Sequence, residues 1–229
     1  MKENAKRDFL FGLALLCAFV IWTFLICTAD VRAAGVNGTN IGFAAFNVWF
    51  HEITGVNMTL YTITDWLGLV PIAVCMSFGT LGLVQLIKRR SLLCVDRDII
   101  LLGVYYILVI SGYLIFEAIP INYRPVLING FMEASYPSST TLLVLSVMPT
   151  LVFQIRHRVK SKAIVITVAV LSGLFSIFMV TGRLISGVHW ATDIIGSVLL
   201  STGLFLIYRE SVLYSDKLSL LKGSGGNGI

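Results

Sequence analysis

A histidine and an aspartate four residues apart carry the clearest chemistry in this sequence. His189 and Asp193 belong to the segment TGRLISGVHWATDIIG, at the start of an apolar run. Residues four apart lie on one face of a helix, so we expect Asp193 to hold His189 in one tautomer and to stabilise its imidazolium. Arg183, slightly earlier, carries a guanidinium that can bind two phosphate oxygens at once. The segment predicts a nucleophile or base beside an anion, although a His–Asp pair that only joins two helices would look the same.

Two further segments place polar residues where an anion could bind. In YPSSTT, Pro137 suits the first turn of a helix. Ser138, Ser139 and Thr140 would then lie beside unpaired backbone amides, and such a helix start favours an anion. In NYRPVL, Arg124 precedes a proline that stiffens the chain. Taken alone, the first segment is an ordinary helix cap and the second a lipid-headgroup anchor.

The elements that must position these residues are apolar helices long enough to cross a membrane. Hydrophobic residues make up 57% of the chain and charged residues 13%, whereas a soluble domain has about 25% charged residues. Apolar runs cover residues 9–28, 66–87, 99–116, about 136–155, 163–182 and 190–208. Each is long enough to span a bilayer, and only helices satisfy their own backbone groups in lipid. The sequence therefore predicts an all-α, polytopic bundle of six transmembrane helices.

The remaining segments leave room for one membrane domain, which we place at residues 1–222. The Gly-rich residues 223–229 are expected to form a flexible tail. The longest connection, residues 29–65, is moderately polar with several aromatics and predicts an interfacial segment. The four cysteines show no metal-ligand spacing, so neither a metal nor a disulfide framework is expected. The oligomeric state is left open.

The cations predict the orientation of the chain in the membrane. Of 17 Lys and Arg, all but three fall in loops on one side of the predicted bundle. The three exceptions are Arg32, Arg124 and Arg183. By the positive-inside rule both termini are cytoplasmic in a multi-pass plasma-membrane protein. The net charge of +5 lies in short loops between apolar runs, so we expect no nucleic-acid partner.

Polar residues near the outer ends of the third to sixth predicted helices have no such topological explanation. They are Glu117, Arg124, Glu133, Ser138, Ser139, Thr140, Thr141, Arg183, His189 and Asp193. Ionisable groups at membrane depth are costly, which makes a functional site the first hypothesis. Together they predict a phosphate pocket that faces the extracytoplasmic side.

The order and spacing of these residues resemble the type 2 phosphatidic acid phosphatase superfamily. That family carries the motifs K-x6-R-P, P-S-G-H and S-R-x5-H-x3-D. The corresponding residues are, in order, Glu117, Arg124 and Pro125; Pro137, Ser138, Ser139 and Thr140; Gly182, Arg183, His189 and Asp193. The resemblance covers the second half of the chain directly, and the whole chain in its six-span topology.

The resemblance implies a membrane lipid phosphatase that works without a metal or cofactor. His189 would be the nucleophile that forms a phosphohistidine, and Asp193 would orient it. Arg124 and Arg183 would bind the phosphoryl oxygens, with the Ser138 hydroxyl and neighbouring amides. The expected substrate is an isoprenoid or glycerolipid (pyro)phosphate at the outer leaflet: undecaprenyl diphosphate first, then phosphatidic acid or phosphatidylglycerol phosphate.

Three positions depart from the family motifs. Glu117 replaces a phosphate-binding Lys, Gly182 replaces a Ser, and Thr140 replaces the His that protonates the leaving group. Thr cannot serve as a general acid, a role that contributes about 10²–10⁴-fold.

Four interpretations follow from these departures. In the first, the substrate is a diphosphate, whose leaving group needs little protonation. In the second, Glu133, Glu117 or His51 replaces the missing general acid. Alternatively the protein is a lipid phosphotransferase, or it binds or moves a phospholipid without catalysis. A transporter or channel is disfavoured, because the polar residues gather at the helix ends and not at mid-membrane depth.

Overall fold

The structure, a computed structural model, describes residues 3–224 as a bundle of helices without a β-strand. In chain order the elements are α1 (Glu3–Thr28), the short 3-10 helix η1 (Val36–Gly38), α2 (Ala44–Thr54), α3 (Met58–Leu67), α4 (Leu69–Arg89), η2 (Leu92–Cys94), α5 (Arg97–Ala118), α6 (Ser139–Arg158), α7 (Lys162–Ile185) and α8 (Ala191–Ser224). Within this part of the chain, six helical segments are long and apolar enough to cross a membrane. The predicted all-α fold with six spans is therefore confirmed.

The second and the last span extend furthest beyond their apolar runs. The second begins at Met58, because α3 continues into α4 through Gly68, whose φ of −58° and ψ of −18° are helical. The last helix extends beyond residue 208 to Ser224, since charged residues end an apolar run without ending a helix. Residues 223 and 224 of the predicted tail thus close α8, and residues 225–229 lie outside the described residues.

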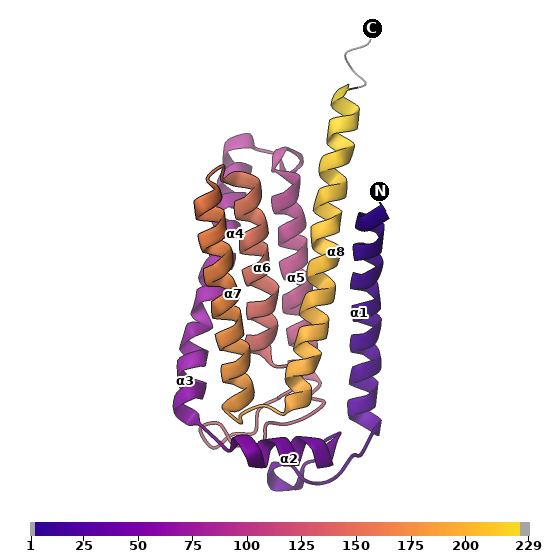
Figure 1. Cartoon of the computed structure of the whole chain (residues 1–229), viewed down its shortest axis with the longest axis vertical. Coiled ribbons are helices and arrows are strands. Elements are labelled where there is room, and N and C mark those ends of the chain that lie inside the picture. The colour runs from indigo at the N-terminus through magenta and orange to yellow at the C-terminus, as the bar shows by residue number, and fades with distance from the viewer. Residues whose placement is uncertain (1–2, 225–229) are drawn as a thin grey trace.

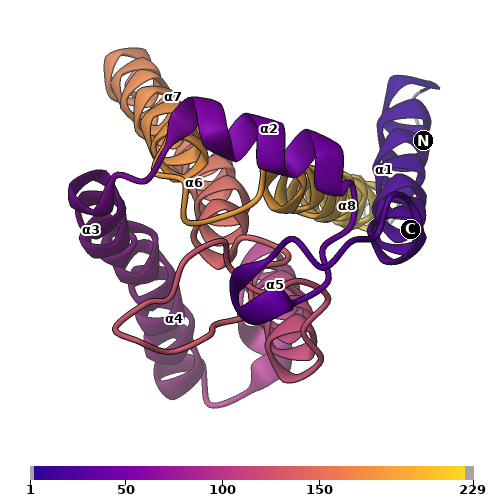
Figure 2. The same cartoon turned by 90° about the horizontal axis from the view of Figure 1, so that it is seen from below.

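The long helices lie side by side, and α2 crosses one end of the bundle (Figures 1 and 2). This helix lies within residues 29–65, where we predict an interfacial segment. Its neighbouring aromatic residues Phe46 and Trp49 are exposed. Trp is one of the amphipathic aromatic residues that are enriched at the membrane–water interface.

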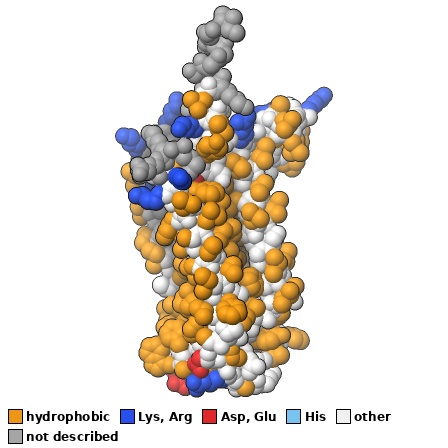
Figure 3. Space-filling view, turned by 90° about the vertical axis from the view of Figure 1, so that its right-hand side faces the viewer, with side chains coloured by type: hydrophobic (Ala, Val, Ile, Leu, Met, Phe, Trp, Pro, Cys, Tyr) orange, Lys and Arg blue, Asp and Glu red, His pale blue; other side chains and the backbone are white. Residues whose placement is uncertain are grey.

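Helices α6 and α8 form the inside of the bundle. About half of each span is buried, compared with no more than 22% of any other. Their buried faces carry small hydroxyl residues such as Ser146, Thr150, Ser197 and Ser201, which allow close helix packing in lipid. The remaining helices expose Leu, Ile, Val and Phe over the flank of the molecule (Figure 3). Lipid is the solvent that this surface fits.

The two ends of the bundle differ in charge. We call the end where α1 begins and α8 ends the basic end, and the end with α2 and the α5–α6 and α7–α8 loops the site end. Lys and Arg side chains gather at the basic end, and a few cations lie beside Asp and Glu at the site end (Figure 3). The cytoplasmic location of the basic end stays a prediction from the charge pattern.

Candidate active site

A hairpin-like loop between α5 and α6 brings two polar residues to the site end. Its tip is Asn129–Gly130, and both residues have positive φ (51° and 83°), as a two-residue type I′ turn requires. Across the hairpin, the Arg124 amide donates to the Glu133 carbonyl at 3.0 Å. Ser135 follows in the returning segment of the loop and is buried. The Asn-Gly turn thus sets the backbone positions of Arg124 and Ser135 at the site end.

His189 lies in the short loop that joins α7 to α8 and is buried. This loop approaches the end of α2 so closely that a Cβ on Gly187, at φ +66°, would lie 1.9 Å from the Gly55 carbonyl oxygen. The Nδ1 atom of His189 lies 3.1 Å from the Ser135 carbonyl oxygen, which can only accept a hydrogen bond. Nδ1 therefore carries the proton, and Nε2 keeps its lone pair. Nε2 has no hydrogen-bond partner among the described residues.

Asp193 reaches His189 through an intermediary. We expected the two residues to stack within one helix, but α8 begins at Ala191, after the histidine. The carboxylate Oδ2 is 3.9 Å from His189 Nδ1, beyond hydrogen-bond distance. Instead it accepts from the Ser135 hydroxyl at 2.5 Å and from the Trp190 amide at 2.9 Å, the latter as in a helix capping box. Asp193 therefore holds Ser135 and the helix start, and Ser135 holds His189.

Arg124 and Arg183 approach each other over one aromatic ring. Their guanidinium carbons lie 5.7 and 4.7 Å from the centroid of Tyr61, within cation–π range. The Arg183 side chain is only 1% exposed. Arg183 Nε and Arg124 Nη1 are buried and lack a partner in the described part of the chain. Two buried cations thus keep unused donors close together.

Each arginine also has a carboxylate neighbour. Arg124 Nη2 pairs with Glu133 at 3.1 Å, and Arg183 Nη2 pairs with Asp65 at 3.0 Å. Arg183 Nη2 donates to the Thr140 hydroxyl as well, at 2.5 Å. These contacts fix the guanidinium planes while leaving the unused donors free.

The start of α6 presents backbone amides to the same region. The helix begins at Ser139 with Ser138 as its N-cap residue, and the Ser138 side chain does not cap it; its hydroxyl donates to Thr141 at 3.1 Å. Pro137 lies before the cap, not in the first turn as we expected, because Ser138 is extended. First-turn amides have no partner within a helix, and together with the helix dipole they favour an anion.

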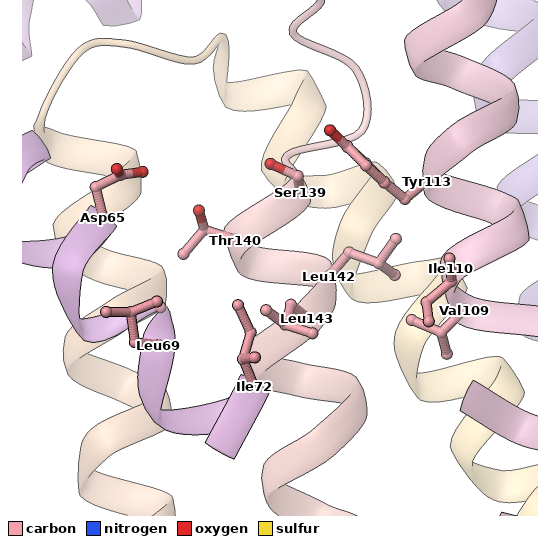
Figure 4. A pocket seen from close by; sticks show the side chains of 11 residues that line it. Asp65, Leu69, Ile72, Val109, Ile110, Tyr113, Ser139, Thr140, Leu142 and Leu143 are labelled. Carbon is pink, nitrogen blue, oxygen red and sulfur yellow. The ribbon is translucent and has the colours of Figure 1, made fainter. Parts of the chain in front are cut away.

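A cavity of about 370 Å³ opens beside Thr140. Asp65, Tyr113, Ser139 and Thr140 lie toward one end of it, and Leu, Ile and Val side chains of α4, α5 and α6 line the rest (Figure 4). Such a lining suits an amphiphile with a polar head and an apolar chain.

Burial holds His189 in its neutral form. Loss of hydration lowers the pKa of the imidazole well below its ordinary value of 6.5, and the charges of Arg124 and Arg183 lower it further. The hydrogen bond to Ser135 acts in the opposite direction but is the smallest contribution. A neutral imidazole with an unpaired Nε2 is the form in which histidine is a nucleophile.

The structure brings most of the predicted site residues together. His189, Asp193, Arg124, Arg183 and Thr140 are linked as described. Ser138 and Ser139 lie at the start of α6 beside them, and Glu133 pairs with Arg124. Glu117, in the last turn of α5, is exposed and makes no ion pair with any described residue. His51 packs against Trp190 at 5.6 Å between ring centroids.

Sequence reasoning missed Ser135, Tyr61 and Asp65. Asp65 carried a usable signal, because it is an acidic residue at the edge of an apolar run, the criterion that singled out Asp193. Ser135 and Tyr61 carried none, since their roles depend on contacts across the fold. Within residues 3–224 no group of three or more His, Cys, Asp or Glu could hold a metal ion.

Comparison with known proteins places the chain in a family. The family model described as PAP2 superfamily matches residues 99–217, which include all three motif segments. No curated protein matches the sequence. A solved structure described as the first transmembrane PAP2 type phosphatidylglycerolphosphate phosphatase from Bacillus subtilis is similar in fold, with a TM-score of 0.60 at 16% identity. The match covers 90% of this chain and 96% of that one. The chain belongs to the PAP2 superfamily.

Proposed function

We propose that this protein hydrolyses a lipid phosphate at the outer leaflet, with His189 as the nucleophile. Family membership supports a lipid phosphatase in general terms. One observation supports this site in particular: His189 Nε2, Arg124 Nη1 and Arg183 Nε are all buried without a partner in the described residues. A buried polar group without a partner costs free energy. A bound phosphate would accept hydrogen bonds from the two arginine nitrogens and would present phosphorus to the Nε2 lone pair.

The reaction follows from this arrangement in two steps. Phosphate oxygens accept hydrogen bonds from the two guanidinium groups and the first-turn amides of α6, which places phosphorus opposite Nε2. The Nε2 lone pair attacks phosphorus, the bond to the lipid oxygen breaks, and a phosphohistidine forms. Water then displaces the histidine and releases inorganic phosphate. The Ser135 carbonyl stabilises the Nδ1 proton while the ring is positively charged, and Asp193 holds Ser135 in place.

The cavity beside Thr140 supports a substrate with an apolar chain. Undecaprenyl diphosphate is the first candidate, because its leaving group is a phosphate that needs little protonation. Phosphatidic acid and phosphatidylglycerol phosphate are next. The charge pattern supports the outer leaflet, since it predicts that the basic end is cytoplasmic.

Release of inorganic phosphate by purified protein in detergent tests the proposal. Undecaprenyl diphosphate and phosphatidic acid would be compared for the wild type, His189→Ala and His157→Ala. His157 is an exposed histidine at the basic end and serves as the matched control. We expect His189→Ala to lose at least about a thousandfold in rate, with an acid-labile phosphorylated protein only where His189 is present. Lipid binding without phosphate release by the wild type would contradict the proposal and favour the binding protein.

Intact cells test the membrane side. Water-soluble para-nitrophenyl phosphate added outside should be hydrolysed without lysis in cells that express the wild type. Hydrolysis only after lysis would place the site in the cytoplasm.

A further inference from the structure

The carboxylate of Asp65 occupies the position from which a leaving group would be protonated. Asp65 lies near the end of α3, 3.0 Å from Arg183 Nη2, and Thr140 accepts from the same nitrogen at 2.5 Å. Thr140 stands where the family motif has its acid. Asp65 and Thr140 also line the same cavity (Figure 4). Unlike Thr140, Asp65 carries a group that can release and accept a proton.

A second departure from the motifs makes room for this carboxylate. At Gly182, where the motif has Ser, a Cβ atom would lie 2.7 Å from the Thr64 methyl group. The Thr64 hydroxyl donates to the backbone carbonyls of its own helix at 2.9 Å, which holds that methyl in place. Glycine therefore lets α3 pack closely on α7, and this contact brings Asp65, the next residue, onto Arg183. Gly182 and Thr140, on two different helices, both adjoin the Asp65 segment.

The position of the cavity puts Asp65 on the leaving-group side. A lipid chain in the cavity would join its phosphate through an oxygen at the polar end, where Asp65 and Thr140 lie. His189 is not among the residues that line the cavity, so its Nε2 approaches phosphorus from elsewhere. Displacement at phosphorus requires the nucleophile and the leaving oxygen roughly in line. The Asp65 side chain is 57% exposed, which leaves its second oxygen free to meet a substrate.

We propose that Asp65 is the general acid and base of this enzyme, in place of the missing motif histidine. This inference rests on the proposed phosphatase function. When His189 Nε2 attacks, the P–O bond to the lipid breaks and the Asp65 proton moves to the leaving oxygen. In the second step the Asp65 carboxylate takes a proton from the attacking water, the P–N bond breaks with its electron pair returning to Nε2, and phosphate leaves.

Two esters that differ in their need for a proton test the proposal. Dioctanoyl phosphatidic acid releases an alkoxide that must be protonated, whereas para-nitrophenyl phosphate releases a phenolate that leaves without a proton. Asp65→Asn keeps an oxygen that can accept from Arg183, and so removes the proton while preserving that contact. We expect kcat/KM for phosphatidic acid to fall about a hundredfold or more, and for the aryl ester less than about threefold.

Control variants distinguish a failure of the Asp65 proposal from a failure of the proposed phosphatase function. Glu52→Gln changes an exposed carboxylate on α2 outside the site, and should leave both rates unchanged. Loss of both rates in His189→Ala shows that the assay reports the proposed function. If the wild type hydrolyses neither ester, the proposed function is overturned, and this inference with it. Equal loss on both esters in Asp65→Asn would overturn the acid role alone, and so would an unchanged rate on phosphatidic acid.

Discussion

At the basic end, Arg89 pairs with Asp96 at 2.7 Å while the two side chains stay 44% and 40% exposed; at the site end, Arg183 pairs with Asp65 at 3.0 Å and is itself 1% exposed. Solvent can therefore reach the first arginine. The second is shielded from solvent, and its Nε is left without a partner among the residues described. Exposed pairs contribute little to stability, whereas a buried charge is costly unless fully paired.

This difference separates two uses of the same side chain. The cations at the basic end need only be positive, because the charge pattern alone orients a membrane protein. Those at the site end must lie in one geometry, which Tyr61, Asp65 and Glu133 impose. Changes at the two ends should therefore have very different effects.

Among changes to the arginines at the two ends, the largest effect is expected where the geometry of a buried one is lost. Arg183→Lys keeps the charge but removes the planar fork, so an oxygen of the transferred phosphate loses a placed donor. We expect kcat/KM to fall about a hundredfold, measured as phosphate release from phosphatidic acid. A loss below about threefold would mean that charge alone suffices at both ends.

A gain of function should follow when the motif acid is restored in the absence of Asp65. Thr140→His combined with Asp65→Asn places an imidazole at the polar end of the cavity. We expect the double variant to hydrolyse phosphatidic acid about tenfold faster than Asp65→Asn alone, a part of the usual general-acid effect. If the double variant shows no gain on phosphatidic acid but still hydrolyses para-nitrophenyl phosphate, residues 65 and 140 are not alternative positions for the general acid.

The effect of the site-end charges should be visible in the titration of His189. Burial first, and then Arg124 and Arg183, lower the pKa of this imidazole well below 6.5. His189 should thus stay neutral as the pH falls through 6.5, and Arg124→Ala should raise its pKa because one repelling charge is gone. Nitrogen-15 NMR of labelled histidine measures both, with exposed His157 as the internal reference. A downward shift in Arg124→Ala would contradict this assignment.

The smallest effect is expected at the basic end. Arg89→Ala removes an exposed ion pair with Asp96 and a hydrogen bond to the Cys94 carbonyl. We expect a change of about 1 kcal/mol or less in the free energy of unfolding and an unchanged kcat/KM. A clear loss of activity in a folded variant would show that the two ends are coupled.

Much of this arrangement could be predicted from the sequence, because lipid imposes simple rules. Apolar runs predicted the six spans, and the motif spacing predicted that His189, Arg124 and Arg183 lie near one another. The route from Asp193 to His189 through Ser135 could not be predicted, since it depends on α8 beginning two residues after the histidine. Asp65 was assigned to a loop because polar residues precede it, whereas that segment is helical, continues into α4 and packs against Gly182.

The burial of α6 and α8 bears on how the protein is made. Both helices carry hydroxyl groups that suit protein neighbours better than lipid, so each gains from partners that are already in the membrane. Since α8 follows both arginine segments in the chain and supplies Asp193, the proposed phosphate site cannot assemble before α8 has been made. A nascent chain that ends before α8 would contain both arginines and yet lack the carboxylate that holds Ser135 and His189 in place.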